Sequence, residues 1–267
     1  MNSAMKIIIS PAKKMNDCDD WSGTLQLPVF VEKAEKLKNY IGTLSREEAA
    51  GMWKCNEKLT ELNYQRFKRM DLRANLTPAL LAYEGIQYQY MAPSVFNLQQ
   101  WEYVKHHLRI LSGFYGILRP EDGVACYRLE MQARGKFPFG NGAVPSLYQF
   151  WNRMIYDELA KDGGKDEGVE ILNLASKEYS KAVEPYLKKE DRFITCVFGS
   201  IEEGRGGKKI KVKGTEAKMA RGEMVRFMAE HQIEKLEEIK AFDRLGYQFR
   251  EEWSGKEELV FCKDKKI

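Results

Sequence analysis

Residues 109–120 read Arg-Ile-Leu-Ser-Gly-Phe-Tyr-Gly-Ile-Leu-Arg-Pro, and the fold assignment starts from them. An apolar run typical of a strand stops at Ser112, two glycines flank an aromatic pair, and a proline stiffens the turn that follows. Glycine gives the backbone freedom, and exposed amides beside arginines attract anions. The stretch therefore predicts a strand and an anion-binding loop at Gly113 and Gly116, with Arg109, Arg119 and Arg128 around it. The alternative is that Arg119 and Arg128 form ion pairs with nearby acids: Glu121, Asp122 or Glu130.

Strands and helices are predicted to interleave along the rest of the chain. Residues rich in β-branched and aromatic side chains predict strands at 6–10, 79–83, 108–111, 169–174, 192–198, 209–213, 247–250 and 258–262. Helical patterns and capping boxes predict helices at 29–41, 45–56, 57–68, 146–159 and 217–231. Glycine-rich polar stretches at 135–142, 161–168 and 202–207 are expected to be surface loops. The pattern predicts an α+β (mixed α/β) fold in a single domain over residues 1–267, with a sheet core flanked by helices.

Composition places the chain among ordinary globular proteins. Of its 267 residues, 43% are hydrophobic and 31% are charged, with no apolar run long enough to span a membrane and no secretory signal. We therefore expect a cytoplasmic protein without a membrane partner, in which Met5 is an alternative start and residues 1–4 an extension. The five cysteines are scattered, which predicts neither a disulfide framework nor a zinc ribbon. Cys126 alone, two residues from Arg128, suggests a peroxide-reactive thiol, with burial as the alternative.

Basic residues concentrate near the helix predicted at 217–231. Seven lysines and arginines fall within residues 208–226, although the net charge of the chain is only +4. Lys218, Arg221 and Arg226 lie opposite the apolar arc of the helix, and Gly222 lies between them. A glycine in a helix costs about 1 kcal/mol, which close approach of a ligand would explain, and the first turns of a helix attract phosphate. The alternative is a solvated basic face.

Two further segments follow predicted strands. Ser10-Pro11-Ala12-Lys13 comes after strand 6–10, and carboxyl ends of strands form the ligand crevices of open sheets, so Lys13 is expected to point into a cleft. A surface lysine is the alternative. Asn173, Ser176 and Lys181 follow strand 169–174 and offer hydrogen-bond donors and a cation for the wall of the same cleft. Packing and capping are the alternative roles for Asn173 and Ser176.

Several kinds of site find no support in the sequence. No Walker lysine or Rossmann glycine pattern is present, so neither nucleotide hydrolysis nor NAD binding is indicated. The three histidines, His106, His107 and His231, are unsuited to chelation or to a catalytic triad. We predict no metal site and no cofactor.

Five ordered segments resemble the YaaA family of bacterial peroxide-stress proteins. They are 10–13 (Ser-Pro-Ala-Lys), 109–131, 147–151 (Leu-Tyr-Gln-Phe-Trp), 173–179 (Asn-Leu-Ala-Ser-Lys-Glu-Tyr) and 217–222 (Ala-Lys-Met-Ala-Arg-Gly). The resemblance implies a single-domain fold with a basic cleft and a helix-hairpin-helix element that contacts DNA, for which 29–56 is the candidate. Its connection, residues 42–45, lacks the glycine loop of such elements, so an ordinary helical hairpin is the alternative.

The resemblance implies a cytosolic, non-enzymatic protein that binds duplex DNA and junctions without sequence specificity. It would protect DNA during peroxide stress and lower free iron indirectly. The residues expected to contact phosphate are Lys13, Arg109, Gly113, Gly116, Arg119, Arg128, Asn173, Ser176, Lys181, Lys218, Arg221, Gly222 and Arg226.

Two other functions stay open. The same cleft suits an enzyme acting on a small phosphorylated or nucleotide-like substrate. In that enzyme Lys13 or Tyr127 would transfer a proton or attack, Glu130 would act as an acid or base, and arginines would hold the anion. An interaction module without catalysis or nucleic acid is the third possibility.

Overall fold

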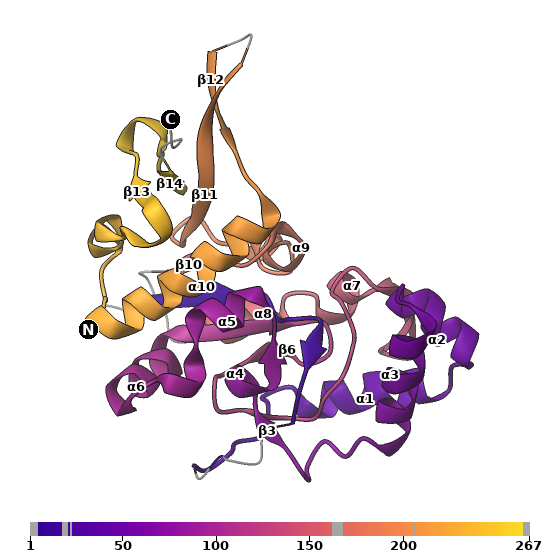
Figure 1. The fold of residues 1–267 in the computed structure, drawn as a ribbon. Coiled ribbons are helices and arrows are strands. Elements are labelled where there is room, and N and C mark those ends of the chain that lie inside the picture. Colours follow the sequence, from indigo (N-terminus) through magenta and orange to yellow (C-terminus); the bar gives the residue numbers. More distant parts are fainter. Residues whose placement is uncertain (1–4, 18–20, 22, 162–167, 205–206, 264–267) are drawn as a thin grey trace.

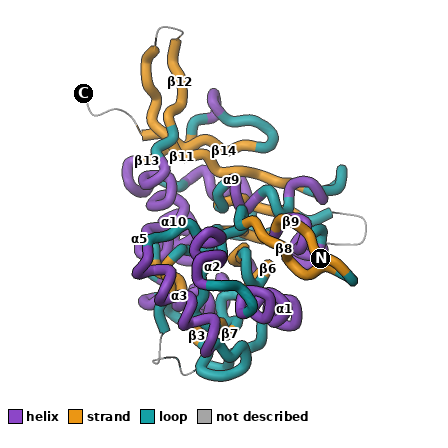
Figure 2. The backbone as a smooth tube through the Cα atoms, turned by 90° about the vertical axis from the view of Figure 1, so that its right-hand side faces the viewer, coloured by secondary structure: helices purple, strands orange, loops and turns teal. Residues whose placement is uncertain are grey.

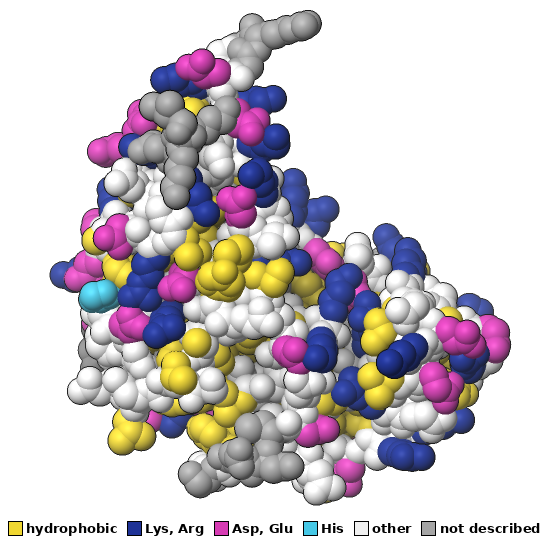
Figure 3. Space-filling model, viewed as in Figure 1, with side chains coloured by type: hydrophobic (Ala, Val, Ile, Leu, Met, Phe, Trp, Pro, Cys, Tyr) yellow, Lys and Arg dark blue, Asp and Glu magenta, His cyan; other side chains and the backbone are white. Residues whose placement is uncertain are grey.

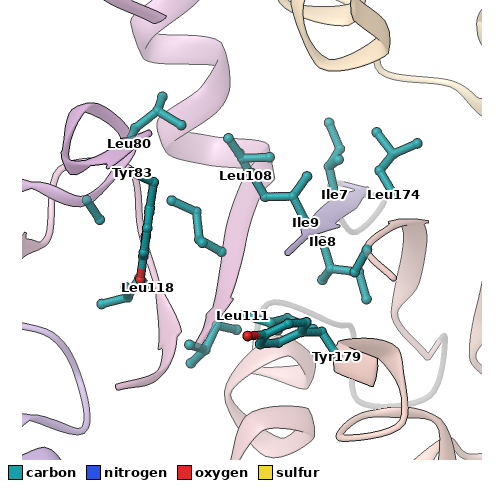
Figure 4. Packing of buried hydrophobic residues seen from close by; sticks show 14 of the residues in the cluster. Ile7, Ile8, Ile9, Leu80, Tyr83, Leu108, Leu111, Leu118, Leu174 and Tyr179 are labelled. Carbon is teal, nitrogen blue, oxygen red and sulfur yellow. The ribbon is translucent and has the colours of Figure 1, made fainter. Parts of the chain in front are cut away.

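The centre of the fold is the short strand β1 (Lys6–Ile9), whose three isoleucines are completely buried. The computed structural model describes residues 5–17, 21, 23–161, 168–204 and 207–263. Burial on both faces is typical of a central strand in a parallel sheet. Figure 4 shows the three isoleucines among Leu108, Leu174 and Tyr179 in the main core.

Eight described strands form the main sheet, in the order β13-β14-β11-β10-β1-β5-β6, with β12 paired to β11. The pairings among β1, β5, β10, β11 and β14 are parallel, whereas β6, β12 and β13 pair antiparallel with their neighbours. The bounds are β5 Leu108–Ser112, β6 Gly116–Leu118, β10 Glu170–Leu174, β11 Arg192–Gly204, β12 Gly207–Lys211, β13 Tyr247–Phe249 and β14 Glu258–Lys263. The predicted α+β class, with a mixed sheet and helices around it, is confirmed.

The strand order reverses at β1. The chain passes from β1 to β5 on one side of it, then returns to β10 on the other side and continues outward to β11 and β14. In the register, Ile8 lies opposite both Asn173 of β10 and Arg109 of β5. A crevice opens where neighbouring parallel strands leave in opposite directions, at their carboxyl ends. That point lies between Ser10 and Ser176.

Three helices cover part of the sheet. The long helix α10 (Gly214–His231) contacts β11, α5 (Ile86–Met91) and α6 (Leu98–His107), and α6 also contacts β1 and β5 (Figure 1). Asn97 caps α6 in a capping box with Gln100. None of the described helices is both long enough and apolar enough to traverse a lipid bilayer.

The remaining helices and strands lie around this core. They are α1 Val31–Gly42, α2 Arg46–Trp53, α3 Glu57–Arg69, α4 Ala79–Ala82, α7 Leu147–Trp151, α8 Met154–Ala160 and α9 Lys177–Ser180, with 3-10 turns at Pro93–Val95, Glu184–Tyr186, Leu236–Ala241, Arg244–Gly246 and Glu251–Trp253. Three small two-stranded sheets pair β2 (Lys14–Met15) with β4 (Tyr83–Glu84), β3 (Thr77–Pro78) with β7 (Gly123–Val124), and β8 (Arg134–Phe139) with β9 (Gly142–Ser146). Figure 1 and Figure 2 both show the β11–β12 hairpin projecting from the rest of the molecule.

Most predicted elements are present, but three expectations were wrong. Residues 79–82 form the short helix α4 instead of a strand, and only Tyr83 of that prediction lies in a strand, β4. Residues 135–142 belong to the β8–β9 hairpin instead of a loop. The helix predicted at 146–159 is two helices, because Asn152 has a φ of 45° and ends α7 after the predicted Ser146 cap. Residues 202–204 belong to β11, whereas 1–4, 162–167 and 205–206 lie outside the described residues.

The helix-hairpin-helix element expected at 29–56 is not confirmed. Helices α1 and α2 form there, and the Ser45 capping box is present, but α2 packs mainly on α3. Arg46, at the start of α2, pairs with Glu57 and Glu61 of α3. The pairing gives α2 a neighbour other than α1, which agrees with an ordinary packed helical region.

The loop at Gly113 and Gly116 is buried, and its amides are in use. The Ser112 hydroxyl accepts hydrogen bonds from the amides of Phe114 (3.1 Å) and Tyr115 (2.9 Å). A Cβ at Gly113 would lie 2.5 Å from the Leu129 main-chain oxygen, and Gly116 has a φ of +77°. Close packing and turn geometry therefore account for both glycines, and this loop is not an exposed phosphate loop.

Candidate anion-binding site

A pocket of about 370 Å³ opens at the point where the strand order reverses. Its wall comes from the segment after β1, from α5, from α9 and from α10. The polar lining residues are Ser10, Lys13, Lys14, Glu84, Gln87, Glu130, Ser176, Glu178, Lys218 and Arg221, and the apolar and aromatic ones include Pro11, Ala12, Ile86, Tyr88 and Tyr179. The structure therefore brings together Lys13, Glu130, Ser176, Lys218 and Arg221, which the sequence placed in one cleft.

Two serines close the floor between β1 and β10. The Ser10 hydroxyl accepts a hydrogen bond from the Ser176 amide (2.8 Å) and lies 3.2 Å from the Ser176 hydroxyl. Tyr88 of α5 donates to the Ser10 main-chain oxygen (3.0 Å). These bonds hold α5 and the starts of two loops in fixed positions around the pocket.

Arg221 is the half-buried cation of the pocket, and it has no counter-charge among the described residues. It makes no ion pair or hydrogen bond with any described residue, and its Nε is buried. Burial lowers the pKa of the guanidinium, which stays charged at neutral pH. A buried unpaired donor costs about 1–3 kcal/mol, and more when charged. An anionic ligand bound beside Arg221 would remove that cost.

Gln87 adds a second unpartnered donor near Arg221. The side chain is 6% exposed, and its Nε2 has no partner among the described residues. Its main-chain oxygen lies against Gly222, since a Cβ there would be 2.1 Å away. Gly222 therefore allows α10 to approach α5, and the space beside it belongs to Gln87 rather than to a ligand.

Lys13 and two carboxylates form the other end of the pocket. The Glu130 carboxylate lies 2.9 Å from the Lys13 Nζ and 3.0 Å from an Arg128 nitrogen, so it is paired with two cations. Glu178 accepts from the Gln132 amide (3.3 Å) and makes no ion pair with a described residue. Burial raises the pKa of Glu178, Glu130 raises it further, and Lys13 opposes both.

Lys218 lies on the outer side of the pocket. Its side chain is exposed and forms no ion pair within the described ranges. Helix α10 begins at Gly214, three residues before the predicted start, so Lys218 and Arg221 lie in its second turn. The attraction expected from a helix N-terminus therefore does not apply to them, and their own charges are the source of the positive potential.

Arg109 and Arg119 line a different pocket, of about 220 Å³, together with Asp122 and Glu158. Arg109 donates to the main-chain oxygens of Lys105 and Leu108, at the start of β5. Arg119 lies 3.9 Å from Glu158. The structure does not bring these two arginines to the carboxyl ends of β1 and β10.

Three more predicted residues have protein partners or lie outside the pocket. Asn173 is buried and bonds Thr195 and the Ala175 amide, which fits the capping alternative. Arg226 pairs with Glu230. Lys181 is exposed at the end of α9 and does not line the pocket.

Tyr127 and Cys126 are both shielded. The Tyr127 hydroxyl is 2.6 Å from Ser112 Oγ and 2.7 Å from the Tyr83 hydroxyl, and burial raises its pKa to about 12. Cys126 donates to Asp17, and burial likewise raises the pKa of its thiol to about 12. A reactive thiolate is therefore disfavoured at Cys126.

Sequence reasoning missed Gln87 and Glu178. Glu178 stands inside the segment 173–179, but its role depends on burial beside Glu130, which spacing does not reveal. Gln87 lies on α5, for which the sequence pattern predicted no helix. In the described ranges there is no group of three or more His, Cys, Asp or Glu side chains suited to a metal ion.

The fold and the pocket define a mixed-sheet protein with a cation-lined pocket at the reversal of strand order. Comparisons with known proteins identify its family. A family profile described as "Peroxide stress protein YaaA" matches residues 5–253. The chain belongs to that family.

Relatives are similar over nearly their whole length. A UPF0246 protein of Agathobacter rectalis is 52% identical over 96% of this chain and 98% of its own. UPF0246 proteins of Desulfitobacterium hafniense and Pediococcus pentosaceus are 50% and 48% identical, each over 97% of this chain and 98% of their own.

Proposed function

We propose that this protein binds DNA through its phosphate backbone, with one phosphate held at Arg221 and Lys218. The observation that carries the proposal is the half-buried Arg221 side chain, whose Nε is buried without a hydrogen-bond partner. Arg221 faces a pocket and has no carboxylate partner among the described residues. Arginine and lysine are the usual phosphate ligands.

A group of exposed cations, here called the basic rim, supports contact with a longer polyanion. It consists of Arg134 of β8, Lys177 of α9, Lys181 directly after α9, and Lys218, none of which forms an ion pair with another described residue. The Tyr148 hydroxyl donates to the Glu178 main-chain oxygen (2.8 Å), and Arg134 lowers the pKa of Tyr148 that burial raises. Tyr148 belongs to α7, so these contacts place β8 beside α7, and α7 beside α9 at the pocket.

The surface beside the β11–β12 hairpin has a suitable shape. Figure 3 shows a concave outline between this hairpin and the part of the molecule that carries α2 and α3, with lysines and arginines on both sides. An open concave surface admits a duplex or a junction. Such binding would be largely independent of sequence, would shield DNA from peroxide damage, and would lower free iron only indirectly.

Fluorescence anisotropy with a labelled duplex and a four-way junction, from low to physiological salt, tests the proposal. Arg221→Ala and Lys218→Ala should each reduce the slope of log affinity against log salt by about 1, since each removes about one phosphate contact. Lys105→Ala, which removes a paired cation on α6, should leave the slope unchanged. Circular dichroism checks that each variant is folded. Absence of DNA binding, or equal slopes in all four proteins, contradicts the proposal.

A further inference from the structure

The pocket at Arg221 has two chemically different ends. Arg221 and Gln87 form one end, where buried donors lack partners. Glu130, Glu178 and Lys13 form the other. These three groups act on one another electrostatically, whereas no carboxylate acts on Arg221. A backbone phosphate alone would use the first end and leave the second without a role.

Glu178 offers an acceptor that the protein does not fill. Glu130 forms ion pairs with both Lys13 and Arg128. Among the described residues, by contrast, the Glu178 carboxylate accepts hydrogen bonds from main-chain amides next to Glu130 and forms no ion pair. A half-buried carboxylate that has no direct ion-pair partner favours a ligand that donates hydrogen bonds to it, such as one with an amino group.

Aromatic and apolar side chains lie in the same pocket. Tyr88 and Tyr179 line it and are almost completely buried, and Pro11, Ala12 and Ile86 add apolar surface. Aromatic side chains are the surfaces on which nucleobases stack. A volume of about 370 Å³ lies at the lower end of the range for pockets that enclose one small ligand.

We propose that the pocket takes a single nucleoside monophosphate unit whose base carries an exocyclic amino group. The phosphate is held by Arg221 and Lys218, the base lies against the tyrosines, and its amino group donates to Glu178. This inference rests on the phosphate site proposed above. The unit is either a free nucleotide or an unpaired residue of a DNA strand, and the chemistry is the same for both.

Isothermal titration calorimetry with dCMP and dUMP tests the end of the pocket at Glu178, where the base would lie. The two ligands differ at C4, which carries an amino group in dCMP and a carbonyl oxygen in dUMP, and at N3, which carries a proton only in dUMP. Because the 4-amino group of dCMP donates to Glu178 whereas dUMP presents an acceptor at that position, dCMP should bind about tenfold more tightly or better. Glu178→Gln should abolish this preference, because the amide both donates and accepts. Inorganic phosphate should bind more weakly than either nucleotide.

The phosphate end is tested with deoxycytidine and with variants of the cations. Arg221→Gln should reduce dCMP binding to the level of deoxycytidine. Lys218→Ala should weaken dCMP binding about tenfold, as the loss of one charged hydrogen bond predicts. Because Lys218 is exposed, that variant stays informative if Arg221→Gln fails to fold. Lys105→Ala should bind like the unchanged protein.

Competition separates the two sources of the ligand. If dCMP displaces a labelled single-stranded oligo(dC), a free nucleotide is sufficient to occupy the pocket. Binding of oligo(dC) that depends on Glu178, without binding of dCMP, identifies a strand residue. Equal binding of dCMP, dUMP and phosphate overturns the inference. If duplex binding still depends on Arg221 in that case, only this inference fails. If dCMP binds as expected but no DNA does, only the DNA proposal fails.

Discussion

At Gly222, helices α5 and α10 approach so closely that a Cβ would lie 2.1 Å from the Gln87 main-chain oxygen. Gly222→Ala should therefore lower the free energy of unfolding by about 1–3 kcal/mol through overpacking, although alanine favours a helix. Urea unfolding measures the change. Gly214→Ala, on the same helix with nothing within 4 Å of its Cβ, is the matched control and should be neutral or slightly stabilising. Equal stability of the two variants would show that the contact is loose.

Tyr127 belongs to a buried chain of hydroxyl groups. Tyr127→Phe leaves Ser112 and Tyr83 each without one hydrogen-bond partner, so the free energy of unfolding should fall by about 1–3 kcal/mol. Binding of DNA or nucleotide should stay unchanged, because the hydroxyl does not line the pocket. Tyr90→Phe is the control, since its hydroxyl makes no hydrogen bond with a described residue. If Tyr127→Phe lost binding without losing stability, Tyr127 would take part in ligand binding.

The positions of single residues in the pocket could be predicted where charge and place in the chain agree. Lys13 is a cation after a strand, and Lys218 and Arg221 lie on the polar side of a helix; all three line the pocket, as the sequence predicted. Gly222 could not be assigned correctly, because a glycine that admits a neighbouring helix and one that admits a ligand look alike in a sequence. The difference is the position of Gln87, which only the fold provides.

Among the elements, the turn between β6 and β7 contains a buried acid. Asp122 Oδ2 accepts from the Arg119 amide (2.8 Å), and burial raises the pKa of Asp122 to about 7. The folded protein therefore holds a proton that the unfolded chain loses near pH 4. The contribution of Asp122 to the free energy of unfolding is fully present below that pH and is lost as the pH rises toward 7.

Asp122→Asn should remove this pH dependence. In the unchanged protein, the contribution of Asp122 to the free energy of unfolding should fall by on the order of 3 kcal/mol between pH 4 and pH 7. The amide keeps an acceptor for Arg119, so the variant should be more stable relative to the unchanged protein at pH 8 than at pH 4. Urea unfolding at the two pH values measures the difference. A constant difference would mean that Asp122 is ionised when folded.

The helices and strands that the sequence predicted best are those with a simple pattern of apolar and polar residues. The strands of the main sheet are apolar runs between turns. The capping box at Ser45 and the N-cap at Ser146 were correctly identified, although Ser146 does not form a full capping box. Helix α4 is only four residues long, which is too short for a helical period to show. The β8–β9 hairpin is glycine-rich and largely exposed, so its sequence is that of a loop.

For the whole molecule, the basic surface differs from the one indicated by residue counts. The lysines of β12 face acids across the hairpin: Lys208 lies opposite Glu203, Lys209 opposite Glu202, and Lys211 pairs with Glu202 at 3.2 Å. Replacing Lys208 and Lys209 by Ala should therefore change the salt dependence of DNA binding little. Replacing Lys177 and Lys181 of the basic rim should reduce the slope by up to about 2. The reverse ranking in anisotropy titrations would place DNA on the hairpin.

The hydrogen bond between Ser10 and Ser176 joins residues that are 166 positions apart. During synthesis, which proceeds from the N-terminus, β1 is made early, but its second neighbour β10 and the pocket helix α10 follow only after most of the chain has emerged. Contacts of such long range form slowly, because loop closure must precede them. The pocket is consequently complete only once α10 has been made, so a chain released early by the ribosome would leave the central strand β1 without its neighbour β10 and would lack this pocket.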